Sequence, residues 1–242
     1  FGVRGIKIYV DGLPETFVDG QSQLDNINLE IINQLEVLRG INSSLYGNSS
    51  GGIISISTID FFEKDFIRTN LSVGSFESLK LNLNSGINLK RGKIIFHLNR
   101  SSSDGFRENS KFLNHNFNFK YLRKFDKGDI KIIANILDSP YAEDPGGLTL
   151  NEVESKRNQA RKINVDFDSG EKVNQFKIGL LLNKEIGQFT LKNKLFFNNR
   201  LFFGKLPYTV GGIIDLKKNF WGYNLNINTE KIIEHKIGRA HV

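Results

Sequence analysis

The residues whose spacing most resembles a chemical site are the glycines and serines of positions 47–52, Gly-Asn-Ser-Ser-Gly-Gly. Glycine-rich loops of this kind can wrap backbone N–H groups around a phosphate. A nucleotide-binding loop also needs a lysine at a fixed position and a helix after it, and this sequence has neither. We therefore interpret these glycines as residues that allow tight backbone bends between two strands.

The other side chains with catalytic or metal-binding chemistry are scattered along the chain. The histidines, which are His97, His115, His235 and His241, have no spacing that suits a metal site. Neither a Ser-His-Asp arrangement nor a pair of carboxylates can be argued from spacing. We therefore expect no enzyme activity, no metal site and no other cofactor.

The composition excludes further classes of protein. The 242 residues contain no cysteine, which excludes disulfides and cysteine-based zinc sites. The formal charge is +7, but lysines and arginines are interspersed with acids and asparagines and form no basic helix. A solvated polar face is the better interpretation, so we expect no nucleic-acid partner. A mildly basic wall could still help to attract anionic ligands.

Both ends of the chain look interrupted. The sequence has no methionine and begins inside an ordered pattern, so we expect an internal fragment, with any signal peptide upstream of it. Residues 236–242, KIGRAHV, resemble the translation of a sequencing adaptor and are excluded from the interpretation.

After about residue 63, apolar and polar residues alternate, which is typical of two-faced β-strands. In residues 113–121 one face is large and apolar and the other carries asparagine and lysine. The same rhythm predicts strands around residues 67–73, 79–83, 94–98, 130–136, 163–167, 176–182, 189–197 and 223–227. No stretch approaches the roughly 20 apolar residues of a transmembrane helix. A membrane β-barrel remains compatible, because its strands need apolar residues only at alternate positions.

The connections between the predicted strands differ in length, and their pattern favours a membrane barrel over a soluble sandwich. Short turns are predicted around residues 74–75, 90–92, 126–128 and 185–187, and longer polar segments at 101–111, 139–160 and 204–218. Tight turns at one end and long loops at the other are typical of outer-membrane barrels. A soluble antiparallel sandwich would also alternate. Long strands, aromatic residues near strand ends and an asparagine-rich polar face favour the barrel.

The first quarter of the chain has a different texture. Residues 7–10 predict a short strand that ends in the turn pair Asp11-Gly12. Residues 24–32 could include one short helix, and residues 35–38 and 53–57 predict further strands. We expect a compact α+β unit whose boundary falls near residues 60–65.

Three segments of this unit carry a family resemblance. In order they are VRGIKIYVDGLP, DGQSQ and LEVLRGINSSLYGNSSGGIISIST, within residues 3–58. Together they resemble the distal half of the plug domain of TonB-dependent outer-membrane receptors. DGFRENS at 104–110 and DPGGLT at 144–149 more weakly resemble loops of the same family.

The resemblance implies a mainly β fold with three segments. Residues 1–62 would be the C-terminal part of the plug, a small α+β unit. Residues 63–235 would be roughly eight or nine antiparallel strands of a transmembrane barrel that has about 22 strands in full-length relatives. Residues 236–242 would be the adaptor artefact.

The resemblance also implies roles for individual residues. Glu36 and Arg39 would be buried against partners on the barrel wall and couple plug release to TonB. If they are instead an ordinary surface ion pair, they contribute little to stability. The glycines at which the plug backbone bends would be Gly12, Gly40, Gly47, Gly51 and Gly52. Gln21 and Gln23 would contact ligand, because amides suit oxygen-rich chelates, but a role as turn-forming polar residues fits them at least as well.

The expected function is active transport of a scarce nutrient, most simply a ferric siderophore or other iron chelate, across the bacterial outer membrane. The partners would be the membrane lipid, the ligand and TonB with ExbB and ExbD, through a TonB box upstream of this chain. A passive barrel channel or adhesin and a secreted all-β carbohydrate-active enzyme are the alternatives. The sequence does not identify the cargo.

Overall fold

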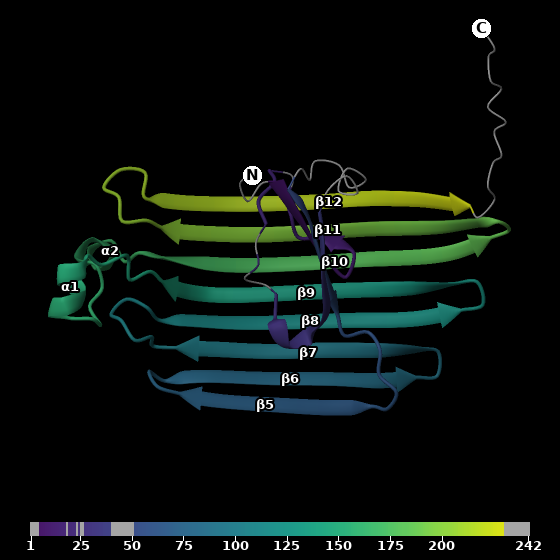
Figure 1. The fold of residues 1–242 in the computed structure, drawn as a ribbon, viewed down its shortest axis with the longest axis horizontal. Coiled ribbons are helices and arrows are strands. Elements are labelled where there is room, and N and C mark those ends of the chain that lie inside the picture. The colour runs from purple at the N-terminus through teal and green to yellow at the C-terminus, as the bar shows by residue number, and fades with distance from the viewer. Residues whose placement is uncertain (1–4, 18, 23, 25–26, 40–50, 230–242) are drawn as a thin grey trace, which may run out of the picture.

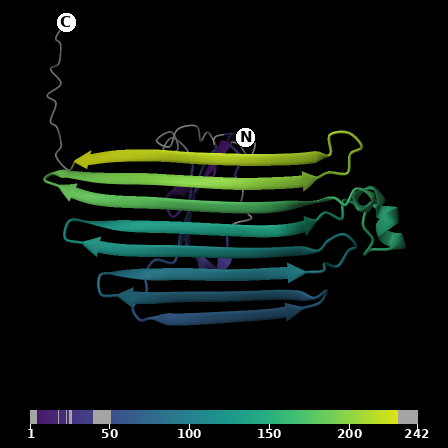
Figure 2. The ribbon, with the colours of Figure 1, turned by 180° about the vertical axis from the view of Figure 1, so that it is seen from behind.

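A computed structural model of the chain describes residues 5–17, 19–22, 24, 27–39 and 51–229, and it contains two β-sheets (Figure 1). The small sheet comes from the first quarter of the chain and the large sheet from the rest. The two views from opposite sides show the small sheet lying against one face of the large sheet (Figures 1 and 2).

The small sheet has the strand order β2-β1-β4-β3. Its strands are β1 (Ile6–Val10), β2 (Leu13–Pro14), β3 (Ile32–Leu38) and β4 (Gly52–Thr58). The two-residue turn between β1 and β2 is Asp11-Gly12, as predicted, and both residues have positive φ, 52° and 80°. This is the geometry that makes Asp-Gly a favoured hairpin turn. The short helix expected within 24–32 is the 3₁₀ turn η2 (Leu29–Ile31).

The large sheet is an antiparallel meander in which each strand pairs with its neighbours in sequence. Its eight strands are β5 (Phe66–Gly74), β6 (Ser78–Leu89), β7 (Gly92–Ser103), β8 (Phe112–Phe125), β9 (Gly128–Glu143), β10 (Gly170–Ile186), β11 (Phe189–Lys205) and β12 (Ile213–Thr229). The predicted mainly β fold, with a small unit followed by antiparallel barrel-type strands, is confirmed.

The connections of the large sheet sort by length onto its two ends. Residues 90–91, 126–127 and 187–188 form two-residue turns at what we name the short-turn end. Residues 104–111, 144–169 and 206–212 form the loops of the opposite, long-loop end, which also holds the turn 75–77. The pattern predicted from the sequence is therefore present, with longer strands than expected.

The two faces of the large sheet differ in chemistry. The outer face is apolar and exposed along its edge strands, with Ile67 and Val73 on β5 and Trp221 on β12 at 72–78% exposure. The inner face is polar, and the small sheet buries much of it. Its buried side chains include Asn82, His97, Asn116, Lys120, Asn135 and Lys177. Within the described residues, no helix is both long enough and apolar enough to cross a membrane.

One predicted strand is wrong. Residues 163–167 alternate apolar and polar, but they lie in the loop between β9 and β10, where Lys162–Asp166 forms helix α2. The polar residue Asn164 is the buried one, and its amide donates to the Asp144 backbone carbonyl and carboxylate. The prediction failed because these residues form a short helical turn whose buried side chain bonds to a polar loop. The same loop contains helix α1 (Leu150–Ser155).

Candidate functional site

The hairpin turn of the small sheet places Asp11 against Lys120 of β8. The Lys120 Nζ lies 2.9 Å from Asp11 Oδ1, and the two side chains are 6% and 4% exposed. The ammonium also donates to the carbonyls of Thr58 and Ile59, each at 3.1 Å. Asp11 accepts from the Thr58 backbone N–H and hydroxyl. Lys120 therefore uses three donors to join the hairpin turn and the end of β4 to the large sheet.

A second buried pair follows four residues along the chain. Glu15 pairs with Lys177 of β10, and their side chains are 2% and 5% exposed. Both buried pairs border one small cavity of about 30 Å³. Removing two charges from water costs several kcal/mol per ion, which good geometry offsets only in part. Each pair therefore fixes the position of the hairpin on the large sheet more than it stabilises the contact.

Between the two acids, Leu13 fits into a gap in the large sheet. Leu13 is completely buried, and it lies over Gly179 of β10. A Cβ added at Gly179 would lie only 2.9 Å from Leu13 Cδ2. The missing side chain at Gly179 is thus what allows the hairpin to approach the strand closely enough for both ion pairs to form.

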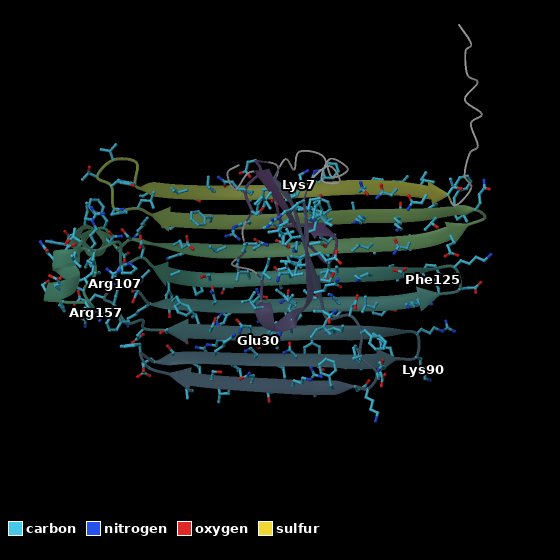
Figure 3. All side chains as sticks on the ribbon, in the orientation of Figure 1. Lys7, Glu30, Lys90, Arg107, Phe125 and Arg157 are labelled. Atoms are coloured by element: carbon cyan, nitrogen blue, oxygen red, sulfur yellow. The ribbon has the colours of Figure 1, made fainter. Side chains whose placement is uncertain are left out.

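Three further ion pairs, which are partly exposed, join the first quarter of the chain to the large sheet. Their Nζ-to-oxygen distances are 2.7 Å for Asp19–Lys218, 2.7 Å for Glu30–Lys80 and 3.4 Å for Asp60–Lys131. The Lys218 ammonium also lies 5.1 Å from the ring centre of Phe17, which is itself buried. Figure 3 shows Glu30 on the small-sheet segment in front of the large sheet.

His97 of β7 lies in this interface, although its position in the sequence looks incidental. Its Nε2 is 2.5 Å from the Asn28 amide nitrogen, and its Nδ1 contacts the Asn84 amide oxygen. Asn28 also caps η2 by accepting from the Glu30 backbone N–H. The neutral tautomer with the proton on Nδ1 satisfies both contacts, so His97 acts here as a buried polar contact for η2. Within the described ranges, no group of acidic or histidine side chains is placed to hold a metal ion.

The residues selected from the sequence lie elsewhere. Glu36 and Arg39 are exposed, and the Glu36 carboxylate accepts from the Gln34 amide at 2.7 Å. Glu36 borders an open cavity of about 830 Å³ between the small sheet and strands β11 and β12. Their coupling role stays a prediction, because no contact described here tests it.

The other predicted positions are also placed in part. The Gln21 amide oxygen accepts from Lys218 at 3.5 Å, which sets Gln21 on the wall of the large sheet. Gly51 donates its N–H to the Gly5 carbonyl, and Gly52 has φ +118° beside the Leu38 carbonyl. Gln23, Gly40 and Gly47 lie outside the described residues.

Sequence reasoning missed Asp11, Glu15, Lys120 and Lys177 as interface residues. A signal was present. Lys120 and Lys177 occupy positions of the alternating pattern whose neighbours on the same face, two residues away, are uncharged. A lysine on such a face needs an acid from another element once it is buried. What the pattern could not supply was the partner, because the pairing joins residues 109 and 162 positions apart (120 less 11, and 177 less 15).

The two loop motifs, DGFRENS and DPGGLT, contact each other at the long-loop end. Arg107 donates to three backbone carbonyls, those of Gln159, Gly146 and Pro145, at 2.9, 2.6 and 3.1 Å. Asn109 donates to the carbonyls of Asp144 and Ser169. Figure 3 shows Arg107 at this end of the sheet, beside the two helices. A single guanidinium thus joins the start of the loop to the segment between α1 and α2.

Replacing Arg107 with lysine is expected to release this loop, because one ammonium cannot satisfy three carbonyls arranged around a planar fork. Hydrogen exchange of amides in residues 144–169 should accelerate at least tenfold, while exchange in β8 and β9 stays unchanged. Arg91→Lys, in an exposed turn at the opposite end, is the matched control. Equal exchange in the two variants would remove Arg107 from this role.

The first turn of α1 should respond to pH. The Thr149 backbone N–H and hydroxyl donate to Glu152 and hold the pKa of its carboxyl below the ordinary 4.5. A lowered pKa stabilises the fold above the ordinary value, and that contribution is lost as pH falls through the lowered value. Amide protection in α1 should therefore fall in acid, and Glu152→Gln should flatten this dependence. The same acid response in both proteins would contradict the capping contact.

Comparison with known proteins identifies the architecture. Residues 1–53 match the TonB-dependent Receptor Plug Domain family. The chain has the fold of a TonB-dependent receptor. Its small sheet is accordingly called the plug below, and its large sheet the barrel wall.

Solved structures of such receptors align with nearly the whole chain at low identity. The ferric citrate transporter FecA in its unliganded form has a TM-score of 0.75 and 18% identity, over 94% of this chain and 36% of FecA. The ferric yersiniabactin uptake receptor FyuA from Yersinia pestis has a TM-score of 0.71 and 16% identity, over 92% of this chain and 36% of FyuA. The siderophore receptor PiuA from Acinetobacter baumannii has a TM-score of 0.69 and 12% identity, over 96% of this chain and 36% of PiuA. This chain therefore spans about a third of the length of these receptors.

Proposed function

We propose that this chain is part of a receptor that imports an iron chelate, or another small scarce nutrient, through the barrel in a step driven by TonB with ExbB and ExbD. The plug would close the barrel at rest and move when TonB pulls on it. The long-loop end would face the outside, where Arg107 holds the loop 144–169 ready for capture of the ligand.

The observation that best supports this proposal is the pair of buried contacts Asp11–Lys120 and Glu15–Lys177 between plug and wall. A plug that only had to seal the barrel would be held at least as well by apolar packing, since buried ion pairs are often no more stabilising than hydrophobic replacements. Charged pairs hold the plug in one position but can be separated once water reaches them. This combination suits a plug that must be both seated and movable.

The experiment is uptake of radiolabelled ferric chelates by iron-starved cells that produce the full-length receptor containing this chain. Uptake is compared in otherwise identical cells with and without TonB. We expect saturable uptake of at least one chelate that is abolished without TonB. Uptake that persists without TonB would instead favour a passive channel, and binding of a surface partner with no uptake would favour an adhesin.

A further inference from the structure

Five ion pairs between plug and wall, all among the residues that the structure describes, have the same polarity. In each of the five the acid lies on the plug or the segment leading from it, and the lysine lies on the wall. They are Asp11–Lys120, Glu15–Lys177, Asp19–Lys218, Glu30–Lys80 and Asp60–Lys131. A set of contacts that served only to hold the plug would work equally well with the charges in either direction. The uniform polarity therefore calls for a second reason.

The lysines are spread over the wall rather than gathered in one spot. They come from strands β6, β8, β9, β10 and β12. The strand register adds Lys93 and Lys194 to the same inner face, because Lys93, Leu122, Lys131, Leu181 and Lys194 are successive partners across the sheet. The ammonium groups of Lys93 and Lys194 donate to plug-side carbonyls, those of Phe62 and Gly12.

Plug movement would therefore change the charge of the lumen. When the acidic hairpin and η2 leave the wall, the lysines lose their counter-charges but remain fixed on the strands. A ligand that passes through the opened lumen comes within the screening length of about 8 Å from several of them. A surface lined with unpaired lysines concentrates anions and repels cations.

We propose that the cargo is an anion, such as a metal chelate with net negative charge from carboxylates. The plug acids occupy the lysines while the barrel is closed, and the anionic cargo replaces them while it is open. This inference rests on the proposed transport function and adds the chemical class of what is carried. It also accounts for the shared polarity, which retention of the plug alone does not require.

The test uses charge-swapped pairs in the full-length receptor. Glu15→Lys with Lys177→Glu, and Asp19→Lys with Lys218→Glu, keep an ion pair in each place but put an acid on the wall. The second pair is partly exposed, at 42% and 26%, so it tolerates exchange even where the buried one does not fold. The control exchanges Asp126 and Lys127, an exposed acid and lysine in a two-residue turn at the short-turn end, outside the loops of the long-loop end.

Each receptor is given two ferric chelates of similar size, a polycarboxylate complex with net negative charge and a neutral hydroxamate complex. Surface binding is measured in cells without TonB, where the plug stays in place, and uptake in cells with TonB. We expect wild-type uptake to favour the anionic complex. The swaps on the wall should lower its uptake about tenfold or more with surface binding unchanged, and the control swap should leave both unchanged.

Two results separate this inference from the proposed function. TonB-dependent uptake that favours the neutral complex, or uptake of the anionic complex that the wall swaps leave unchanged, would overturn the anionic cargo and leave the transporter intact. Absence of TonB-dependent uptake of both complexes, in cells where the receptor is present and folded, would overturn the transport of iron chelates and the inference with it.

Discussion

Replacing Glu15 with glutamine is expected to weaken the attachment of the plug to the barrel wall by about 3–5 kcal/mol, because Lys177 is left buried without its ion-pair partner. Hydrogen exchange of the β1 and β2 amides measures this, since the hairpin must leave the wall for these groups to exchange by local opening. Lys177→Met should cost a similar amount for the same reason.

The double replacement, Glu15→Leu with Lys177→Met, gives the sharper result. Removing both charges also removes the cost of burying them, so attachment should return to near the wild-type level or exceed it. Transport should nevertheless fall, because an apolar contact does not separate by hydration. Lys162→Met, at an exposed helical pair, is the control and should cost less than about 1 kcal/mol. If Glu15→Gln costs no more than this control, the buried pair does not hold the plug.

Filling the gap at Gly179 is expected to displace the hairpin. A valine there would overlap Leu13, which is completely buried, and overpacking of a well-packed site costs about 1–3 kcal/mol and sometimes more. Here the displacement would also separate Asp11 from Lys120 and Glu15 from Lys177, so we expect a loss larger than that range. Leu13→Ala, which leaves a cavity, should cost about 2–5 kcal/mol.

The two substitutions should compensate each other. In the double variant Leu13→Ala with Gly179→Ala, the added methyl group fills part of the volume that the leucine leaves. Protection of the hairpin amides should therefore be higher than in Leu13→Ala or Gly179→Val alone. Gly147→Ala is the matched control, because nothing lies within 4 Å of the added Cβ. Independent, additive effects of Leu13→Ala and Gly179→Ala would show that the two residues do not form one contact.

How far the sequence predicts this structure depends on the range of the interaction. The alternation in residues 113–121 identified β8, and Asp11-Gly12 identified the hairpin turn, because both signals are local. Residues 163–167 show the limit of the same rule. Their alternation is real, but they form a helical turn in a loop, where Asn164 is buried and bonded to Asp144.

The interface was less predictable than the fold. Motif resemblance directed attention to Glu36 and Arg39, which are exposed in the described part of the chain. The buried charges lie instead on Asp11 and Glu15, in a segment whose Asp-Gly pair was already explained by its turn. A turn residue can also form interface contacts. These contacts become apparent only from the strand register, which places Lys120 and Lys177 under the hairpin.

A reversible tether between plug and wall tests directly whether the plug must move during transport. Asp19→Cys with Lys218→Cys introduces the only two cysteines of these 242 residues, at a place where the wild-type ion pair has an Nζ–Oδ2 distance of 2.7 Å. A short, reducible bis-thiol cross-linker is applied to cells that produce the full-length receptor, with each single variant as control. Cross-linking should stop TonB-dependent uptake in the double variant alone, and reduction should restore it. Uptake that continues at its full rate through a cross-linked receptor would contradict a plug that must move.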